Sequence, residues 1–345
     1  MLIQNNTKGK PHIGNLLSYL FLPIFLFILL ALAVFRPNDF ASDYINYKQL
    51  FDSFKLSSNV VVLGSIEPMY IWLSKFVYFF DGGFLSLLFV VTSVSIFIKY
   101  KYAKALFIKP SFIFLYFCVY FLTFYPLYEL TQLRVCLALS FVLYALVNRT
   151  HFGYVFFIML AVLSHYSLAP CVLLLLATQL SRAKIKGTQV NFFITAFIIS
   201  FFLLTFWFLK FLPDKYEGTN YPFYYYFLHP FSIIIIFLLV SFRRMALGSY
   251  SRVYTNIYYI VFLYYSIFAA FIISGNQIPA FRFLEISLFF SLNFLFIGGF
   301  IYKNKLSILL LLVEIFIVIT FFHLIATNPL INFSVFKDYF SLSGV

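Results

Sequence analysis

Long, continuous runs of apolar residues alternate with short polar segments along most of the chain. Continuous runs are typical of membrane-spanning helices, whereas strands of a membrane barrel alternate apolar and polar positions. We therefore expect one all-α, polytopic integral membrane domain over residues 1–345, with about eleven spans, or ten to twelve because several runs are short. The predicted spans are residues 16–35, 84–98, 111–127, 132–148, 152–164, 167–180, 191–209, 230–242, 253–273, 283–301 and 306–323.

The polar segments predict where the chain leaves the membrane. Residues 36–67 and 210–229 are expected to form long loops, and residues 324–345 a tail. Residues 68–80 are apolar but short for a span, and Pro68 at their first position is favourable for a helix start. We interpret this segment as a short interfacial or re-entrant helix.

Composition and charge agree with this topology. Hydrophobic residues make up 63% of the chain and charged residues 10%, which is more apolar surface than a soluble domain can bury. The net charge of +13 does not indicate nucleic-acid binding, because the basic residues collect in short loops, as orientation signals do. With a cytoplasmic N-terminus, the inner loops hold these basic residues and no acidic ones: Lys8, Lys10, Lys99, Lys101, Lys104, Lys109, Arg149, Arg182, Lys184, Lys186, Arg243, Arg244, Arg252, Lys303 and Lys305. The long loops and the tail are then expected on the outer side.

Short motifs predict neither a cofactor nor processing. Cys118, Cys136 and Cys171 lie within apolar segments without ligand-like spacing, and the histidines are scattered, so neither a metal site nor a disulfide framework is expected. Ala31-Leu32-Ala33 faintly resembles a signal-peptidase site. Because the first apolar run is long enough to span, we interpret it as an uncleaved anchor.

Two arginines occupy positions that the topology does not explain. Arg134 and Arg282 lie in about the first turn of spans that enter from the outer side, where a cation opposes the helix macrodipole. In a structural interpretation, Arg134 pairs with Glu129 or snorkels to lipid headgroups, and Arg282 pairs with Glu285 on the same helical face. In a functional interpretation, both bind a pyrophosphate, because the planar guanidinium binds phosphate oxygens bidentately.

Other titratable side chains are candidates as well. His165, between two spans on the outer side, could be an interfacial residue, a phosphate contact or a general base. Arg36 and Lys75 could snorkel to headgroups. Glu314 lies within a span, where a carboxylate is costly unless it is paired or protonated. The carboxylates and tyrosines of residues 210–229 could meet a sugar chain or form an interfacial aromatic belt.

Five stretches, in chain order, resemble the motifs of one known family. They are residues 36–47 (RPNDFASDYINY), 67–70 (EPMY), 133–138 (LRVCLA), 164–168 (SHYSL) and 281–283 (FRF). The resemblance is to the EpsG family of polysaccharide polymerases, relatives of the Wzy O-antigen polymerases. Met69 and Val135 stand where that family usually has Gly and Gln.

The resemblance implies a metal-independent, inverting glycosyltransferase of the GT-C type without a cofactor. Such an enzyme acts at the outer, periplasmic face of the bacterial inner membrane. It moves a growing chain from one undecaprenyl-pyrophosphate carrier onto the repeat unit on another, producing O-antigen, capsular or exopolysaccharide. The implied partners are these carrier-linked glycans and the bilayer, together with a chain-length regulator and a flippase.

The candidate residues take roles within this reaction. Arg134 and Arg282 are expected to bind the pyrophosphate leaving group, and His165 to contact a phosphate or assist the acceptor hydroxyl. Either Asp43 or Glu67 is expected to orient or deprotonate that hydroxyl. The secondary candidates for substrate binding are Arg36, Asp43, Tyr44, Glu67, Glu129 and Gln132.

Two alternative functions stay open. A flippase or exporter of lipid-linked sugars would also need outer cations, but its path should carry charge through both leaflets and its sequence should show repeats. Another membrane glycosyltransferase, such as an O-antigen ligase, would share the chemistry and differ in the acceptor.

Overall fold

The structure is a computed structural model that describes residues 13–37, 42–56, 67–148, 150–184, 194, 198–200, 252–274 and 277–326. The predicted loop at 210–229, the predicted span at 230–242, nearly all of the tail and most of the span at 191–209 lie outside these residues. In chain order the helices are α1 (Ile13–Val34), α2 (Ser42–Leu56), α3 (Pro68–Phe79), α4 (Phe84–Leu106), α5 (Pro110–Thr123), α6 (Tyr125–Tyr128), α7 (Leu133–Val147), α8 (His151–Ser164), the 3₁₀ helix η2 (Tyr166–Leu168), α9 (Ala169–Lys184), α13 (Arg252–Ile273), α14 (Gln277–Phe300) and α15 (Lys305–Ala326). The predicted all-α class is confirmed for the described residues.

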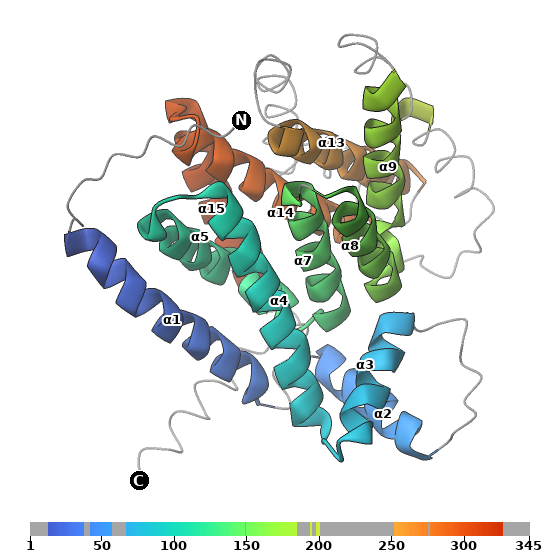
Figure 1. Cartoon of the computed structure of the whole chain (residues 1–345). Coiled ribbons are helices and arrows are strands. Elements are labelled where there is room, and N and C mark those ends of the chain that lie inside the picture. Colours follow the sequence, from blue (N-terminus) through green and yellow to red (C-terminus); the bar gives the residue numbers. More distant parts are fainter. Residues whose placement is uncertain are drawn as a thin grey trace.

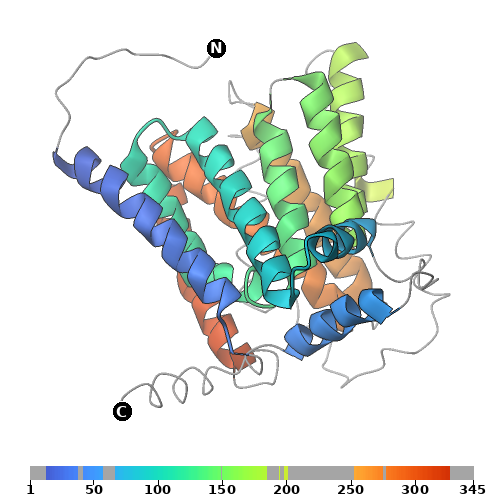
Figure 2. The ribbon, with the colours of Figure 1, turned by 60° about the horizontal axis from the view of Figure 1, so that its bottom comes forward.

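Helices α4 and α7 pack against each other at the centre of the bundle, with α1 and α5 against α4 and with α8 against α7. Helices α13 and α14 form a hairpin, and α15 packs on α14 and α5 (Figure 1). The short helices α2 and α3 contact each other and lie near the start of α4 (Figure 2). We call the end of the bundle at which α1 and α8 end and α7 begins the site end.

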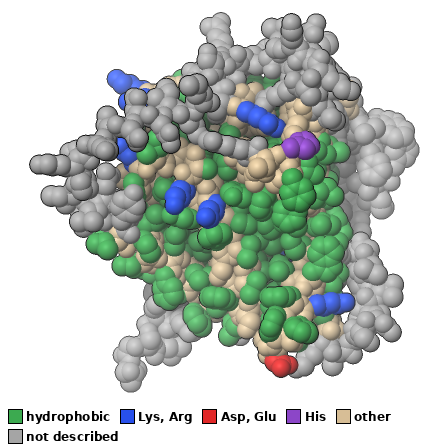
Figure 3. Space-filling model, in the orientation of Figure 1, with side chains coloured by type: hydrophobic (Ala, Val, Ile, Leu, Met, Phe, Trp, Pro, Cys, Tyr) green, Lys and Arg blue, Asp and Glu red, His purple; other side chains and the backbone are tan. Residues whose placement is uncertain are grey.

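The helices have the length and composition of a membrane protein. Within the described ranges, three stretches are long and apolar enough to cross a membrane: Phe84–Leu106, Arg252–Ile273 and Ala280–Phe300. Shorter apolar helices occupy Leu20–Val34, Pro110–Thr123, Leu133–Val147, His151–Ser164 and Tyr166–Gln179. The surface seen in Figure 3 is mostly hydrophobic, and its basic side chains gather mainly in the upper half. The chain is thus a helical, multi-pass membrane protein.

Two segments differ from the prediction. The loop predicted at 36–67 contains α2, whose Tyr44, Tyr47 and Phe51 are buried at helical spacing. The span predicted at 84–98 is too short, because α4 continues to Leu106. Lys99 therefore lies inside a helix, fully buried, and is not an inner-loop residue. By contrast, the short helix predicted at 68–80 is present as α3 and begins at Pro68.

Candidate functional site

Three predicted site residues from separate segments meet at the site end. Oε1 of Glu67 lies 2.6 Å from Nδ1 of His165, and Oε2 of the same carboxylate accepts a hydrogen bond from Nη1 of Arg134. Glu67 is nearly buried, with 6% of its side chain exposed, whereas 27% of Arg134 and 18% of His165 is exposed. One carboxylate therefore holds both a guanidinium and an imidazole, and both remain accessible. The predicted pairing of Arg134 with Glu129 is wrong, since the partner of Arg134 is Glu67.

Helix ends position these three side chains. Glu67 is the N-cap residue of α3 and has extended backbone angles (φ −67°, ψ 135°). Such angles are those that a following proline favours, and here Pro68 occupies the first helical position. His165 ends α8 in an extended conformation, and Arg134 lies in the first turn of α7. Two of the three side chains thus stand where a helix begins, α3 or α7, and the third stands where α8 ends.

The charge state of Glu67 follows from its neighbours. Burial alone would raise the pKa of the Glu67 carboxyl, but the hydrogen bond with His165 and the positive charge of Arg134 outweigh this effect. The pKa of Glu67 consequently lies below its ordinary value. Glu67 is ionised at neutral pH and can orient both partners.

Tyrosines of α2 and α3 support Arg134. The guanidinium lies over the ring of Tyr47, 5.3 Å from its centroid, and Nε is 3.4 Å from the Tyr47 hydroxyl. Tyr70 donates a hydrogen bond from its hydroxyl to the Tyr47 carbonyl at 2.7 Å. Neither tyrosine was among the sequence candidates. The spacing of Tyr44, Tyr47 and Phe51 is the signal that could have identified Tyr47.

Arg36 is buried beside this group. Only 4% of the residue is exposed, and Nη1 donates to the carbonyls of Ala33 at 2.7 Å and Glu129 at 3.2 Å. Its guanidinium lies 5.2 Å from the ring centroid of Tyr44, another predicted site residue. Burial lowers the pKa of Arg36 to about 10, so the side chain is still charged at neutral pH. The interpretation of Arg36 as a snorkelling residue is wrong, because its guanidinium turns into the protein.

Glu129 belongs to a buried ion pair next to this site. Nζ of Lys99 lies 3.1 Å from Oε1 of Glu129, and neither side chain is exposed. Nζ also donates to Ser95 Oγ at 2.5 Å and to Ser140 Oγ at 2.7 Å, while the Cys136 thiol contacts the carboxylate. The Glu129 side chain thus points into the bundle, where it anchors the segment that leads into α7.

Gln132 connects α7 to α14, the helix that carries Arg282. Nε2 of Gln132 donates to Oε2 of Glu285 at 3.3 Å. Gln132 precedes Arg134 by two residues, and Arg282 precedes Glu285 by three, so this bond links the residues next to the two arginines. Arg282 is exposed, and the described ion pairs within 4.0 Å do not include the one predicted with Glu285.

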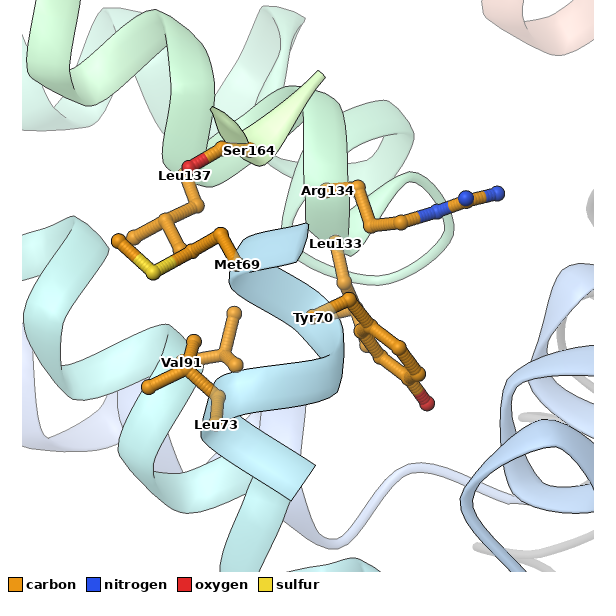
Figure 4. A pocket seen from close by; sticks show the side chains of 8 residues that line it. All are labelled: Met69, Tyr70, Leu73, Val91, Leu133, Arg134, Leu137 and Ser164. Carbon is orange, nitrogen blue, oxygen red and sulfur yellow. The ribbon is translucent and has the colours of Figure 1, made fainter. Parts of the chain in front are cut away.

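An apolar pocket lies behind Arg134, between α3, α4, α7 and the end of α8. It is lined by Met69, Tyr70, Leu73, Val91, Leu133, Arg134, Leu137 and Ser164. In Figure 4 the guanidinium of Arg134 and the hydroxyl of Tyr70 both point away from the apolar side chains. The polar groups of the site therefore face one side of α3 and the apolar pocket the other.

Two remaining candidates have simpler surroundings. Asp43 is partly exposed in the first turn of α2 and, within the described part of the chain, takes part in no ion pair within 4.0 Å. Glu314 is fully buried in α15, where Oε2 accepts a hydrogen bond from Ser291 at 3.1 Å. Among the described residues, no group of three or more His, Cys, Asp or Glu side chains could hold a metal ion.

Comparison with known proteins gives one match. The model of the EpsG family matches residues 19–340, a range that includes every residue of the site. No curated protein and no solved structure matches the chain.

Proposed function

The chain belongs to the EpsG family, which links it to exopolysaccharide biosynthesis, and from this premise we propose that it is a polysaccharide polymerase. Its substrates are oligosaccharide repeat units on undecaprenyl pyrophosphate, and it joins them at the outer face of the bacterial inner membrane. The reaction is an inverting glycosyl transfer of the GT-C type. The observation that carries the proposal is the contact of Glu67 with both Arg134 and His165 at one end of a transmembrane bundle.

The Glu67–His165 pair supports a role as general base. When Nδ1 of His165 donates its hydrogen to the Glu67 carboxylate, Nε2 carries the lone pair and can accept a proton. In the proposed step, the acceptor hydroxyl gives its proton to Nε2 while its oxygen attacks the anomeric carbon of the donor. Glu67 thereby orients the base. Of the two carboxylates expected to act on the acceptor hydroxyl, Asp43 and Glu67, we therefore assign the role to Glu67.

The arginines support a role at the leaving group. As the new bond forms, the bond between the anomeric carbon and the pyrophosphate oxygen breaks, and the electron pair stays on the pyrophosphate. Nη1 of Arg134 donates a hydrogen bond to Glu67, and Nε donates one to Tyr47. Nη2 has no hydrogen-bond partner among the described residues. Nη2 can therefore donate to a phosphate oxygen, with the exposed Arg282 as second cation.

A deletion strain complemented with variants tests this function. Arg134→Ala and His165→Ala should abolish the polymer ladder and leave single repeat units on the lipid carrier at the outer leaflet. Lys75→Ala, which removes an exposed cation from α3, is the matched control and should retain the ladder. A full ladder in either site variant would overturn the mechanism.

The same lipid extracts separate the alternatives. Carrier-linked units trapped at the cytoplasmic leaflet would indicate a flippase. Long chains that are complete but lack their final attachment would indicate a ligase.

A further inference from the structure

Arg36 is a buried cation with unused hydrogen-bond donors. Nε and Nη2 are shielded from solvent, and neither has a hydrogen-bond partner among the described residues. None of the ion pairs among the described residues includes Arg36. A buried charge with unsatisfied donors is costly unless another group complements it. This arrangement suits an anionic ligand that brings its own oxygen acceptors.

A groove runs between α4 and α1, the helix that precedes Arg36. Leu26, Phe27 and Leu30 of α1 line it on one side, and Ile96, Phe97 and Tyr100 of α4 on the other. Helices α1 and α4 converge towards the end of α1 that leads to Arg36 and diverge towards the other end (Figures 1 and 2). Ser93 of α4 is the remaining lining residue, so the lining is mainly apolar and suits a hydrocarbon chain.

The groove lies on α1, and the charged group lies just beyond the end of that helix. Leu30 lies four residues before the last residue of α1, Val34, which corresponds to roughly 6 Å at the helical rise of about 1.5 Å per residue, and Arg36 follows two residues later. The bond from Nη1 to the Ala33 carbonyl folds the guanidinium back over the last turn of α1. A ligand with an anionic head and a long apolar tail could therefore occupy both at once.

The order of groups beyond Arg36 identifies the head. Arg36 lies over Tyr44 and Arg134 over Tyr47, and these rings are three residues apart on one face of α2. Arg134 in turn shares Glu67 with His165. In space, the groove is followed by Arg36, then by Arg134, and then by His165, the proposed base. This order matches the order of tail, two phosphates and reacting sugar in a glycosylated polyprenyl pyrophosphate.

We propose that the α1–α4 groove holds the polyprenyl tail of the donor lipid, with Arg36 binding the phosphate nearest the tail. The assignment of the head rests on the proposed function, since it takes Arg134 and His165 as the reacting end. It gives Arg36 a role separate from that of Arg134: Arg36 anchors the carrier, whereas Arg134 meets the phosphate that leaves the sugar.

Photo-crosslinking of the purified full-length protein tests the site. A photoreactive amino acid replaces Phe27, which is 69% exposed in the groove, and a control protein carries it at Phe152, which is 81% exposed on α8. The probe is radiolabelled undecaprenyl pyrophosphate in detergent. Labelling should occur at position 27 and not at position 152, and unlabelled probe should compete for it far better than phosphatidylglycerol.

Two variants examine the head and the tail separately. Arg36→Gln should weaken labelling at position 27 by roughly ten- to a hundred-fold, because charge-assisted hydrogen bonds are lost. Leu30→Trp fills the groove, leaves Arg36 in place and should also suppress labelling at position 27. Because the two variants change different parts of the site, a folding defect in one of them does not decide the result. Equal labelling at both positions, equal competition by phosphatidylglycerol, or labelling independent of both variants would overturn the proposal.

Polymerisation assays on the same preparations separate this proposal from the proposed function. Specific labelling by a wild-type protein that forms no polymer would refute the polymerase and leave the lipid site intact. Polymer formation with labelling insensitive to Arg36 and Leu30 would refute the lipid site and leave the polymerase intact.

Discussion

Glu67→Gln is the change that bears most directly on the mechanism, because it keeps the shape of the side chain and removes its charge. In the wild-type site, one Glu67 oxygen faces Nδ1 of His165 and the other accepts from Arg134. An amide that presents its NH₂ group to Nδ1 would make that nitrogen an acceptor and place the imidazole hydrogen on Nε2. His165 could then no longer take the proton of the acceptor hydroxyl.

The expected loss of rate is large and the expected loss of stability small. A general base contributes about a hundred- to ten-thousand-fold to a reaction rate, so polymerisation should fall by a factor in that range. The Glu67–Arg134 pair is intermediate between exposed and buried pairs, with 6% and 27% of the side chains exposed. Removing its charge should lower the free energy of unfolding by about 1–3 kcal/mol. The protein should therefore still insert and fold.

The assay compares polymer formed per unit of membrane protein. Asp81→Asn is the matched control, because Asp81 is an exposed carboxylate in the turn between α3 and α4 and has a positive φ of 53°, which Asn tolerates. The control should keep the wild-type rate. Polymerisation by the Glu67→Gln protein at the wild-type rate and protein level would refute the assignment of Glu67 and His165 as base pair.

Three further predictions concern charge. Lys99→Met should lower the free energy of unfolding by about 3–5 kcal/mol, because Glu129 is then buried without its partner, and adding Glu129→Gln should recover part of this loss in a thermal unfolding assay. Arg282→Ala should reduce polymerisation about a hundred- to a thousand-fold at unchanged protein level, since the side chain is exposed; a normal rate would exclude it from the site. Because the pKa of Glu67 is lowered, the stability that its charge contributes is present above the ordinary pKa and is lost only as the pH falls through the lowered one. The difference in unfolding free energy between wild type and Glu67→Gln should hold from pH 7 to about pH 4.5 and disappear at lower pH; a decline already between pH 7 and 5 would contradict the lowered pKa.

Much of the fold follows from local pattern in the chain. Each described helix, apart from α2 and the short turns α6 and η2, coincides with an apolar run, because a backbone in a membrane must satisfy its own hydrogen bonds and does so locally as a helix. The start of α3 follows from Pro68 alone. Likewise, Arg134 and His165 could be selected as candidates because cations and imidazoles at the ends of spans are conspicuous against apolar sequence.

The apolar pattern therefore predicts the helices and the polar side chains that stand at their ends. The partners of these side chains depend on how the helices pack. Arg134 pairs with Glu67, 67 residues away, and Lys99 lies inside α4 because Glu129 from the segment before α7 neutralises it. Arg36 turns inward without an opposite charge, and the carbonyls of Ala33 and Glu129 accept hydrogen bonds from its guanidinium. The pattern along a chain records whether a residue prefers water or hydrocarbon, whereas the cost of a buried charge depends on which distant helix brings the opposite charge beside it.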